Sequence, residues 1–183
     1  MSVTQLNPQA QVSEEQQNEW IQAAQRGDVQ AFQSLYRVHL GRIYALCYRL
    51  AGDADLAQDF CQDAFIRIWQ KLSMFNGESR FSTWAHRLTV NLCLNKLKAQ
   101  KTWWQRFVPM DSAPEAQASV DPNTFNGVDK LLPKLPQQAR VVFVLHAVEG
   151  YKHTEVAQML NIQEGTSKAQ YHRARKLLQE MLK

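Results

Sequence analysis

Hydrophobic residues recur every three or four positions along most of the chain. Phe32, Leu35 and Tyr36 follow this spacing, and Leu88 and Leu92 follow it further along. This period places apolar side chains on one face of an α-helix, whereas a half-buried strand would alternate apolar and polar residues. The sequence contains no stretch of such alternation. The pattern therefore predicts an all-α fold.

Glycine and polar residues divide this pattern into helices. Gly27 and Gly52 end the first two helical runs, and a polar Asn-Gly-Glu-Ser loop at 76–79 separates helices expected over 55–72 and 81–99. These helices are expected to form a first domain over residues 17–104. Residues 1–16 are polar and rich in Gln, so we expect them to form a disordered leader.

The composition changes after the first domain. Residues 105–129 contain Pro109, Pro114 and Pro122, and the stretch from Val108 to Asp129 holds carboxylates but no Lys or Arg. Such a composition favours an extended linker over a packed element. We therefore expect two small helical domains joined by a flexible, acidic linker.

The second domain, residues 130–183, ends in a helix-turn-helix pattern. Pro136 opens a helix expected to run through Ala147. A short helix around 154–160, a turn at 161–163 and a longer helix from Glu164 or Gly165 follow. In a DNA-binding helix-turn-helix, the second helix enters the major groove.

Basic residues gather on this last helix. Lys168, His172 and Arg173 lie about one turn apart, and Thr166 stands at the helix start, where backbone N–H groups favour a phosphate. The helix dipole also favours basic residues toward a helix C-terminus, so charge alone does not separate a DNA-reading helix from an ordinary surface helix. The preceding short helix and turn favour DNA binding.

The 183-residue chain has a formal net charge of only +4, which by itself indicates no particular partner. The charges are unevenly distributed. The stretch from Ser79 to Met110 holds six basic residues and no Asp or Glu, while Asp53 to Asp63 holds four Asp and no Lys or Arg. This separation fits two partners of opposite charge, one partner and a contact within the chain, or ordinary patchiness.

The three cysteines, Cys47, Cys61 and Cys93, form neither a Cys-x-x-Cys pair nor a zinc spacing, and their apolar helical surroundings predict buried free thiols. The five histidines show no metal-ligand spacing, and no Gly-rich phosphate loop with a lysine is present. We therefore expect no metal, no cofactor, no small-molecule substrate and no enzymatic activity. The N-terminal residues lack a signal-peptide pattern, and no apolar run approaches the roughly 18 residues of a membrane span, which predicts a cytoplasmic location.

Both halves together resemble the extracytoplasmic-function, or group 4, sigma factors of bacterial RNA polymerase. The matching stretches are DVQAFQSLYRVHLGRIYALCYRL, AQDFCQDAFIRIWQKLSMFNGESRFSTWAHRLTVNLCLNKLK and LPQQARVVFVLHAVEGYKHTEVAQMLNIQEGTSKAQYHRARKLL. The resemblance covers Trp20 to Lys183, and the order and spacing of its pieces make it specific. It implies a sigma region 2 over 17–104 and a sigma region 4 over 130–183.

The resemblance also implies partners and site residues. Asp59, Gln62 and Asp63 resemble the surface that binds the clamp helices of the polymerase largest subunit, and carboxylates one turn apart suit an Arg-rich partner. Without the resemblance, an ordinary solvated acidic face would be preferred. Gln58 stands where the family commonly has an acidic residue.

For the minus-ten promoter element, the resemblance implies a loop that cradles a base extruded from the opened strand. The loop residues are Phe75, Asn76, Gly77, Glu78, Ser79, Arg80 and Phe81. Arg87, Asn91 and Asn95 lie on successive turns of the following helix, so they are expected to face the same strand, with Lys98 at a phosphate. Trp84 either stacks on a base or packs in the core beside Leu88.

For the minus-35 element, read as duplex, the resemblance implies contacts from the start of the last helix. The residues are Thr166, Lys168, Ala169, Gln170, His172 and Arg173. The family pattern usually places an apolar residue after Gly-Thr, where this chain has Ser167, so a core contact is expected to be weaker. Gln170 is a candidate to pair with adenine.

These inferences together predict a sigma factor that binds core polymerase, recognises minus-35 and minus-ten elements and promotes open-complex formation. A helix-turn-helix activator or repressor acting on duplex DNA alone is the alternative, which leaves the 75–91 stretch without a role. An anti-sigma factor is a further partner implied by the resemblance. Trp103, Trp104 and Phe107 are equally consistent with DNA stacking, docking onto the first domain or contact with a regulator.

Overall fold

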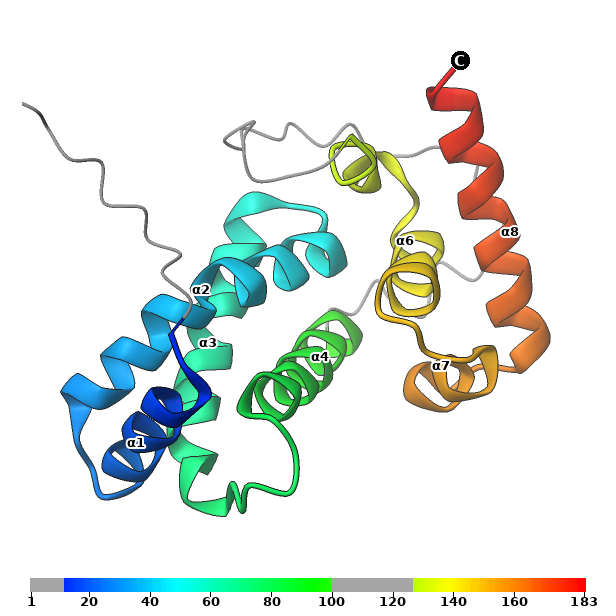
Figure 1. Cartoon of the computed structure of the whole chain (residues 1–183). Helices are drawn as coiled ribbons and strands as arrows, with labels where there is room; N and C mark the ends of the chain where they lie inside the picture. Colours follow the sequence, from blue (N-terminus) through cyan, green and yellow to red (C-terminus); the bar gives the residue numbers. More distant parts are fainter. Residues whose placement is uncertain (1–11, 100–126) are drawn as a thin grey trace, which may run out of the picture.

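The computed structural model describes residues 12–99 and 127–183, and within those ranges every regular element is a helix, with no strand (Figure 1). The predicted all-α fold is confirmed. In the same ranges, no helix combines the length and the apolar character that a membrane span requires. Trp103, Trp104, Phe107 and most of the expected leader and linker lie outside the described residues.

The described part of the N-terminal unit, residues 12–99, contains four α-helices and a short 3-10 helix. They are α1 (Glu14–Gln25), α2 (Val29–Ala51), α3 (Ala54–Lys71), η1 (Leu72–Met74) and α4 (Phe81–Ala99). Ser13, Asp28 and Asp53 precede the first three α-helices, and each accepts a hydrogen bond from a backbone N–H of the first turn. Because Ser13 caps α1, the helix begins at Glu14, earlier than the domain start expected at residue 17.

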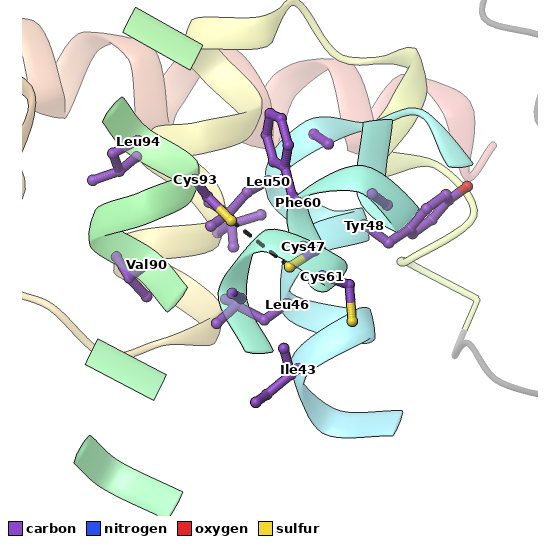
Figure 2. Close-up of a cluster of buried hydrophobic side chains, with 14 of the residues drawn as sticks. Ile43, Leu46, Cys47, Tyr48, Leu50, Phe60, Cys61, Val90, Cys93 and Leu94 are labelled. Atoms are coloured by element: carbon purple, nitrogen blue, oxygen red, sulfur yellow. Dashed lines mark hydrogen bonds between the residues drawn. The ribbon is translucent and has the colours of Figure 1, made fainter. Parts of the chain in front are cut away.

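The core of this unit contains the three thiols (Figure 2). Cys47 of α2, Cys61 of α3 and Cys93 of α4 are buried and free, and the Sγ atoms of Cys47 and Cys93 lie 3.7 Å apart. This confirms the predicted buried thiols. A hydrogen bond to Cys47, with burial, raises the pKa of the Cys61 thiol, which therefore stays protonated at neutral pH.

The C-terminal unit is smaller. It contains η2 (Leu132–Lys134), α6 (Gln137–Phe143), the π-helical turn η3 (Val144–Val148), α7 (His153–Leu160) and α8 (Glu164–Met181). The helix expected from Pro136 through Ala147 is present, but its second half is π-helical rather than α-helical. Asn161 adopts a left-handed conformation with φ 55° and ends α7, so the predicted short helix, turn and longer helix are confirmed.

The two units touch each other. In Figure 1, α6 and α7 lie between α4 and α8, and α6 also contacts α2. Arg140 of α6 reaches the end of α2, and Arg49 of α2 pairs with Asp129. Asp129 was expected to belong to the flexible linker, but it is buried and paired with Arg49.

Candidate nucleic-acid interface

The loop between η1 and α4 is held at both ends by aromatic side chains. Phe75 and Phe81 meet edge to face with ring centroids 5.7 Å apart, and Trp84 packs against both rings at 5.3 and 5.8 Å. Phe81 is buried, and Phe75 and Trp84 are half-buried. The contacts of Trp84 are those of a packing residue that supports the loop.

A side chain of α1 fixes the start of the same loop. The Nε2 atom of Gln25 donates to the backbone carbonyls of Leu72, at 3.0 Å, and Phe75, at 2.8 Å. Beyond this anchor, residues 76–80 are exposed. Asn76 accepts a hydrogen bond from the Glu78 backbone N–H, which shapes the loop locally. The structure therefore presents polar loop residues on a fixed aromatic base.

Helix α4 continues from this loop with exposed polar residues on successive turns. Arg87, Asn91 and Asn95 are all exposed, as the sequence predicts for residues that face one strand. Asn91 and Asn95 line an open groove of about 530 Å³ between α3 and α4. The residues that complete its polar lining are Asp63, Arg67, Gln70, Lys71 and Lys96. Cations and amides in an open groove suit a nucleic-acid backbone and base edges.

Two lysines of α4 are engaged within the chain. Lys96 forms an ion pair with Asp63 of α3, so the acidic and basic stretches of the sequence make a contact with each other. Lys98 donates from Nζ to the backbone carbonyl of Met159 at 2.7 Å. Lys98 thus contacts α7 in this arrangement, although the sequence predicts that it meets a phosphate.

The acidic face of α3 is open on one side. Asp59 and Gln62 are exposed, whereas Asp63 is half-buried beside Lys96. These three side chains lie on one helix within a single turn, so the structure brings together the residues expected to contact polymerase.

The start of α8 carries the residues expected at duplex DNA. Lys168, Ala169, His172 and Arg173 are exposed, and Thr166 is half-buried. Lys168 pairs with Glu164 one turn earlier, with 2.6 Å between Nζ and Oε1. Gln170 lies apart from this group. Its Nε2 donates to Gln138 of α6 at 3.4 Å, and its Oε1 is buried without a partner.

Ser167 and His153 form a polar contact between α7 and α8 that the sequence pattern did not predict. Ser167 is fully buried, and its Oγ shares a 2.9 Å hydrogen bond with Nδ1 of His153. The His153 ring stacks on His146 with centroids 3.9 Å apart, and His146 donates from Nδ1 to the Tyr151 carbonyl at 2.8 Å. A hydrogen-bonded contact therefore takes the place of the apolar one that the family pattern suggests at Ser167.

The surroundings of this contact also affect the protonation of His153, whose ring meets the first turn of α8. Burial, with the neighbouring His146 and Lys168, lowers the pKa of His153 below its ordinary value of 6.5. His153 is therefore neutral at neutral pH, which suits a ring that shares a hydrogen bond with a buried hydroxyl. The sequence signal for this pair was Ser167 at a position where the family pattern has an apolar residue, with a histidine on the facing helix.

The chain matches two family models. Residues 35–102 match Sigma-70 region 2, which contains the loop and α4, and residues 126–178 match Sigma-70 region 4, which contains α7 and most of α8. The matched segments cover most of the described residues and leave out α1.

Similar proteins of comparable length are known. The ECF RNA polymerase sigma factor SigW of Bacillus subtilis is 30% identical over 178 residues, covering 89% of this chain and 95% of that protein. SigM of Mycobacterium tuberculosis, also an ECF RNA polymerase sigma factor, is 30% identical over 165 residues, which cover 90% of this chain and 83% of that protein. The solved structure of the sigma factor RpoE in complex with the anti-sigma factor NepR, from Bartonella quintana, shares the fold. Its TM-score is 0.52 at 24% identity, covering 84% of this chain and 98% of that one.

Proposed function

This chain belongs to the ECF RNA polymerase sigma factors, and on that premise we propose how its surfaces divide the work of transcription initiation. The chain binds core polymerase, directs it to a two-part promoter and promotes strand opening. Phosphodiester synthesis is the chemistry of the core enzyme, so the chain itself is not an enzyme. It acts in the cytoplasm, where polymerase and chromosome meet.

The N-terminal unit holds the opened minus-ten strand. The observation that carries this proposal is that loop residues 76–80 and, on the following helix, Arg87, Asn91 and Asn95 are all exposed next to a packed aromatic base. A flipped base needs a shaped, polar receiving site, and the separated strand needs cations and amides along its backbone. Opening draws on binding energy, so no nucleotide hydrolysis is required.

The C-terminal unit reads the minus-35 duplex. Helix α8 enters the major groove with Lys168, Ala169, His172 and Arg173 outward, and Thr166 lies at the helix start near a phosphate. Gln170 contributes by fixing α8 to Gln138 of α6, and it reaches a base only if it leaves that contact.

The exposed face of α3 binds polymerase. Asp59 and Gln62 are free to meet a basic partner, and Asp63 does so by exchanging Lys96 for an Arg or Lys of the polymerase clamp helices. Since the structural relative RpoE is bound by an anti-sigma factor, an anti-sigma factor is also a partner of this chain.

Reconstituted transcription tests the proposal. The purified chain is mixed with sigma-free core polymerase and genomic DNA fragments, and the 5′ ends of the transcripts are sequenced. New start sites that share two upstream elements, absent without the chain, are the expected result. A folded chain that binds core yet yields no new starts would contradict it, and binding to duplex DNA without core would favour the activator or repressor alternative.

A variant pair localises the minus-35 reading within the same assay. Arg173→Ala is expected to weaken binding to the mapped minus-35 duplex by about 1–3 kcal/mol if Arg173 contacts a base. Lys183→Ala removes an exposed cation at the end of the chain and serves as the control. Equal losses in both variants would indicate a general charge effect rather than base reading.

A further inference from the structure

A series of side-chain contacts joins α1 to the end of the loop before α4. Gln17 of α1 meets His39 of α2, with 3.2 Å between Oε1 and Nε2. The His39 ring packs against Phe81, the first residue of α4, with ring centroids 5.1 Å apart. Phe81 in turn contacts Phe75 and Trp84, the other rings of the aromatic base of the loop. Three helices therefore meet at one histidine beside this base.

His39 is a polar residue within the core of the N-terminal unit. Only 8% of its surface is exposed, so its ring requires a partner within the protein. The amide of Gln17 supplies one, and Nε2 of the same amide donates to the Val12 carbonyl at 3.5 Å, which orients the amide oxygen toward His39. Because an amide oxygen only accepts, Nε2 of His39 carries a proton and donates it in this contact.

The groups that face His39 disfavour a positive charge on its ring. Helix α1 presents the neutral amide of Gln17, α4 presents the ring of Phe81, and α2 itself presents the guanidinium of Arg42. Burial first, and Arg42 second, lower the pKa of His39 below its ordinary value of 6.5. The ring is therefore neutral at neutral pH.

The two ends of the loop are held in different ways. Gln25 holds the start through two hydrogen bonds to backbone carbonyls. Near the end, Arg80 forms an ion pair with Glu14 of α1 at 3.3 Å, but both side chains are largely exposed, and exposed ion pairs contribute little. The buried ring of Phe81 is the firmer anchor, and its contact with His39 joins it to α2.

Protonation would place a second cation beside Arg42 in a buried position. Burying an uncompensated charge is costly, so a group in this position either stays neutral or moves toward water. A His39 ring that moves toward water leaves both Gln17 and Phe81. The anchor at the end of the loop therefore depends on the neutral form of His39.

We propose that His39 is a positioning residue for the strand-binding loop: its neutral ring holds Phe81, and through Phe81 the end of the loop, in the place that receives the minus-ten strand. His39 is buried and acts without contacting DNA. Acid, which charges the ring, weakens capture of the strand. The contacts of His39 stand by themselves, and only the consequence for the strand rests on the proposed function.

NMR spectroscopy of the free full-length chain tests the positioning without DNA. The amide resonance of Gly77, in the exposed loop, and the ring resonances of His39 are followed between about pH 7 and about pH 5. The Gly77 shift is expected to change in step with the charge on His39. His39→Phe keeps an aromatic ring that does not titrate, and it is expected to abolish this change.

Circular dichroism at each pH checks that both chains keep their helices. A Gly77 shift that does not follow His39, or that changes equally in wild type and in a folded His39→Phe chain, would overturn the proposal.

Affinity for a labelled minus-ten single strand measures the consequence. At about pH 7, His39→Ala, which removes the ring, should bind about two- to tenfold more weakly than His39→Phe, which keeps it. As the pH falls to about 5, wild type should lose affinity relative to His39→Phe, because only molecules with a neutral His39 hold the loop in place. The other histidines are the same in both chains, so their titration cancels in this comparison. Equal affinity of the two variants, or equal pH dependence of wild type and His39→Phe, would contradict the proposal.

Two glutamines of α1 provide a test that leaves the histidine in place. Gln17→Ala removes the partner of the His39 ring, so it is expected to shift the Gly77 resonance and to weaken strand binding. Gln16→Ala changes the neighbouring, exposed side chain and is expected to do neither. If the two variants have the same Gly77 shift and the same affinity, the contact between Gln17 and His39 does not position the loop.

The two kinds of measurement separate this proposal from the proposed function. If the Gly77 shift follows His39 but no variant binds the minus-ten strand, the positioning is supported and the strand-binding role of the loop fails. If the strand binds while Gly77 does not respond to His39, the loop keeps its role and the positioning proposal is wrong.

Discussion

The hydrogen bond between Ser167 and His153 shows how one buried hydroxyl constrains a second helix. Ser167 is fully buried, so its Oγ requires a partner within the protein, and His153 of α7 supplies it at 2.9 Å. His153 is in turn held by its stack on His146. The position of α8 on α7 therefore depends on polar atoms in the first turn of α8.

Removing this hydroxyl should cost stability. Ser167→Ala leaves Nδ1 of His153 without its partner, and we expect a loss of about 1–2 kcal/mol in the free energy of unfolding. Urea denaturation followed by circular dichroism measures it. Ser73→Ala, at an exposed serine of η1, should stay within about 0.5 kcal/mol of wild type. A Ser167→Ala chain as stable as the Ser73→Ala chain would show that the bond contributes little.

Two histidines with lowered pKa values, the buried His39 and the half-buried His153, should make the chain sensitive to acid. Burial, with Arg42 nearby, lowers the pKa of His39, and burial with His146 and Lys168 lowers that of His153. An unfolded histidine has a pKa of about 6.5. Between the lowered pKa values of the folded chain and this value, the unfolded chain binds more protons than the folded one, so the free energy of unfolding rises with pH. This stabilisation is complete above about pH 6.5. It is lost as the pH falls toward the pKa values that His39 and His153 have in the folded chain.

The measurement is the urea midpoint at about pH 7 and about pH 5. His39→Gln removes one of the two rings and should reduce the difference between the two midpoints. If the urea midpoints of the His39→Gln chain differ between the two pH values as much as those of wild type, His39 does not contribute to the acid sensitivity.

At the scale of elements, the loop before α4 is held by contacts from outside it. Gln25 of α1 donates to two carbonyls at its start, and Phe81 anchors its end beside Phe75 and Trp84. The matched Sigma-70 region 2 begins at residue 35, after α1, yet α1 supplies the loop's polar anchor. An element outside the family match therefore supports the proposed strand-binding surface.

Removing this anchor should affect the loop specifically. Gln25→Ala leaves the carbonyls of Leu72 and Phe75 without their side-chain donor, so we expect weaker binding of a minus-ten single strand, by about two- to tenfold, with about 1 kcal/mol lower stability. Gln22→Ala, at an exposed position on the same helix, is the control. Fluorescence anisotropy measures the binding, and equal affinity in both variants would remove α1 from the loop's function.

Helix ends and turns depend on residues close in sequence, so the sequence predicted many of them. Contacts between residues far apart in sequence were not predicted. The ends of α4 and the turn between α7 and α8 follow from apolar spacing and turn residues close in sequence. Arg49 and Asp129 are 80 residues apart, and Arg140 lies 89 residues from Ala51, so no local pattern reveals these contacts. The exposure of the site residues follows from local helix periodicity, so it was predictable. The hydrogen bond from Lys98 to the Met159 carbonyl joins residues 61 apart in sequence, so it was not.

At the scale of the whole molecule, separate surfaces carry opposite charges. The acidic face of α3 is exposed through Asp59 and Gln62, while the groove between α3 and α4 contains Arg67 and Lys71. A basic protein partner at Asp59 and Gln62 and a nucleic acid along the groove would therefore meet at Asp63, which lines the groove and also belongs to the acidic face. The Lys96–Asp63 ion pair lies where the two surfaces meet.

Reversing the charge at the centre of the acidic face should separate polymerase binding from folding. Asp59→Lys is expected to abolish measurable binding to core polymerase, because it puts a cation against a basic partner, while the circular dichroism spectrum stays unchanged. Glu19→Lys, an exposed reversal on α1, is the control for net charge. Surface plasmon resonance with immobilised core measures both, and wild-type affinity in Asp59→Lys would remove this face from the polymerase contact.

The three thiols in the core bear on how this chain responds to oxidants. Oxidants react with exposed thiolates, but Cys47, Cys61 and Cys93 are all buried, and the raised pKa values of Cys47 and Cys61 keep those two thiols protonated. These cysteines therefore resist peroxide while the fold is intact.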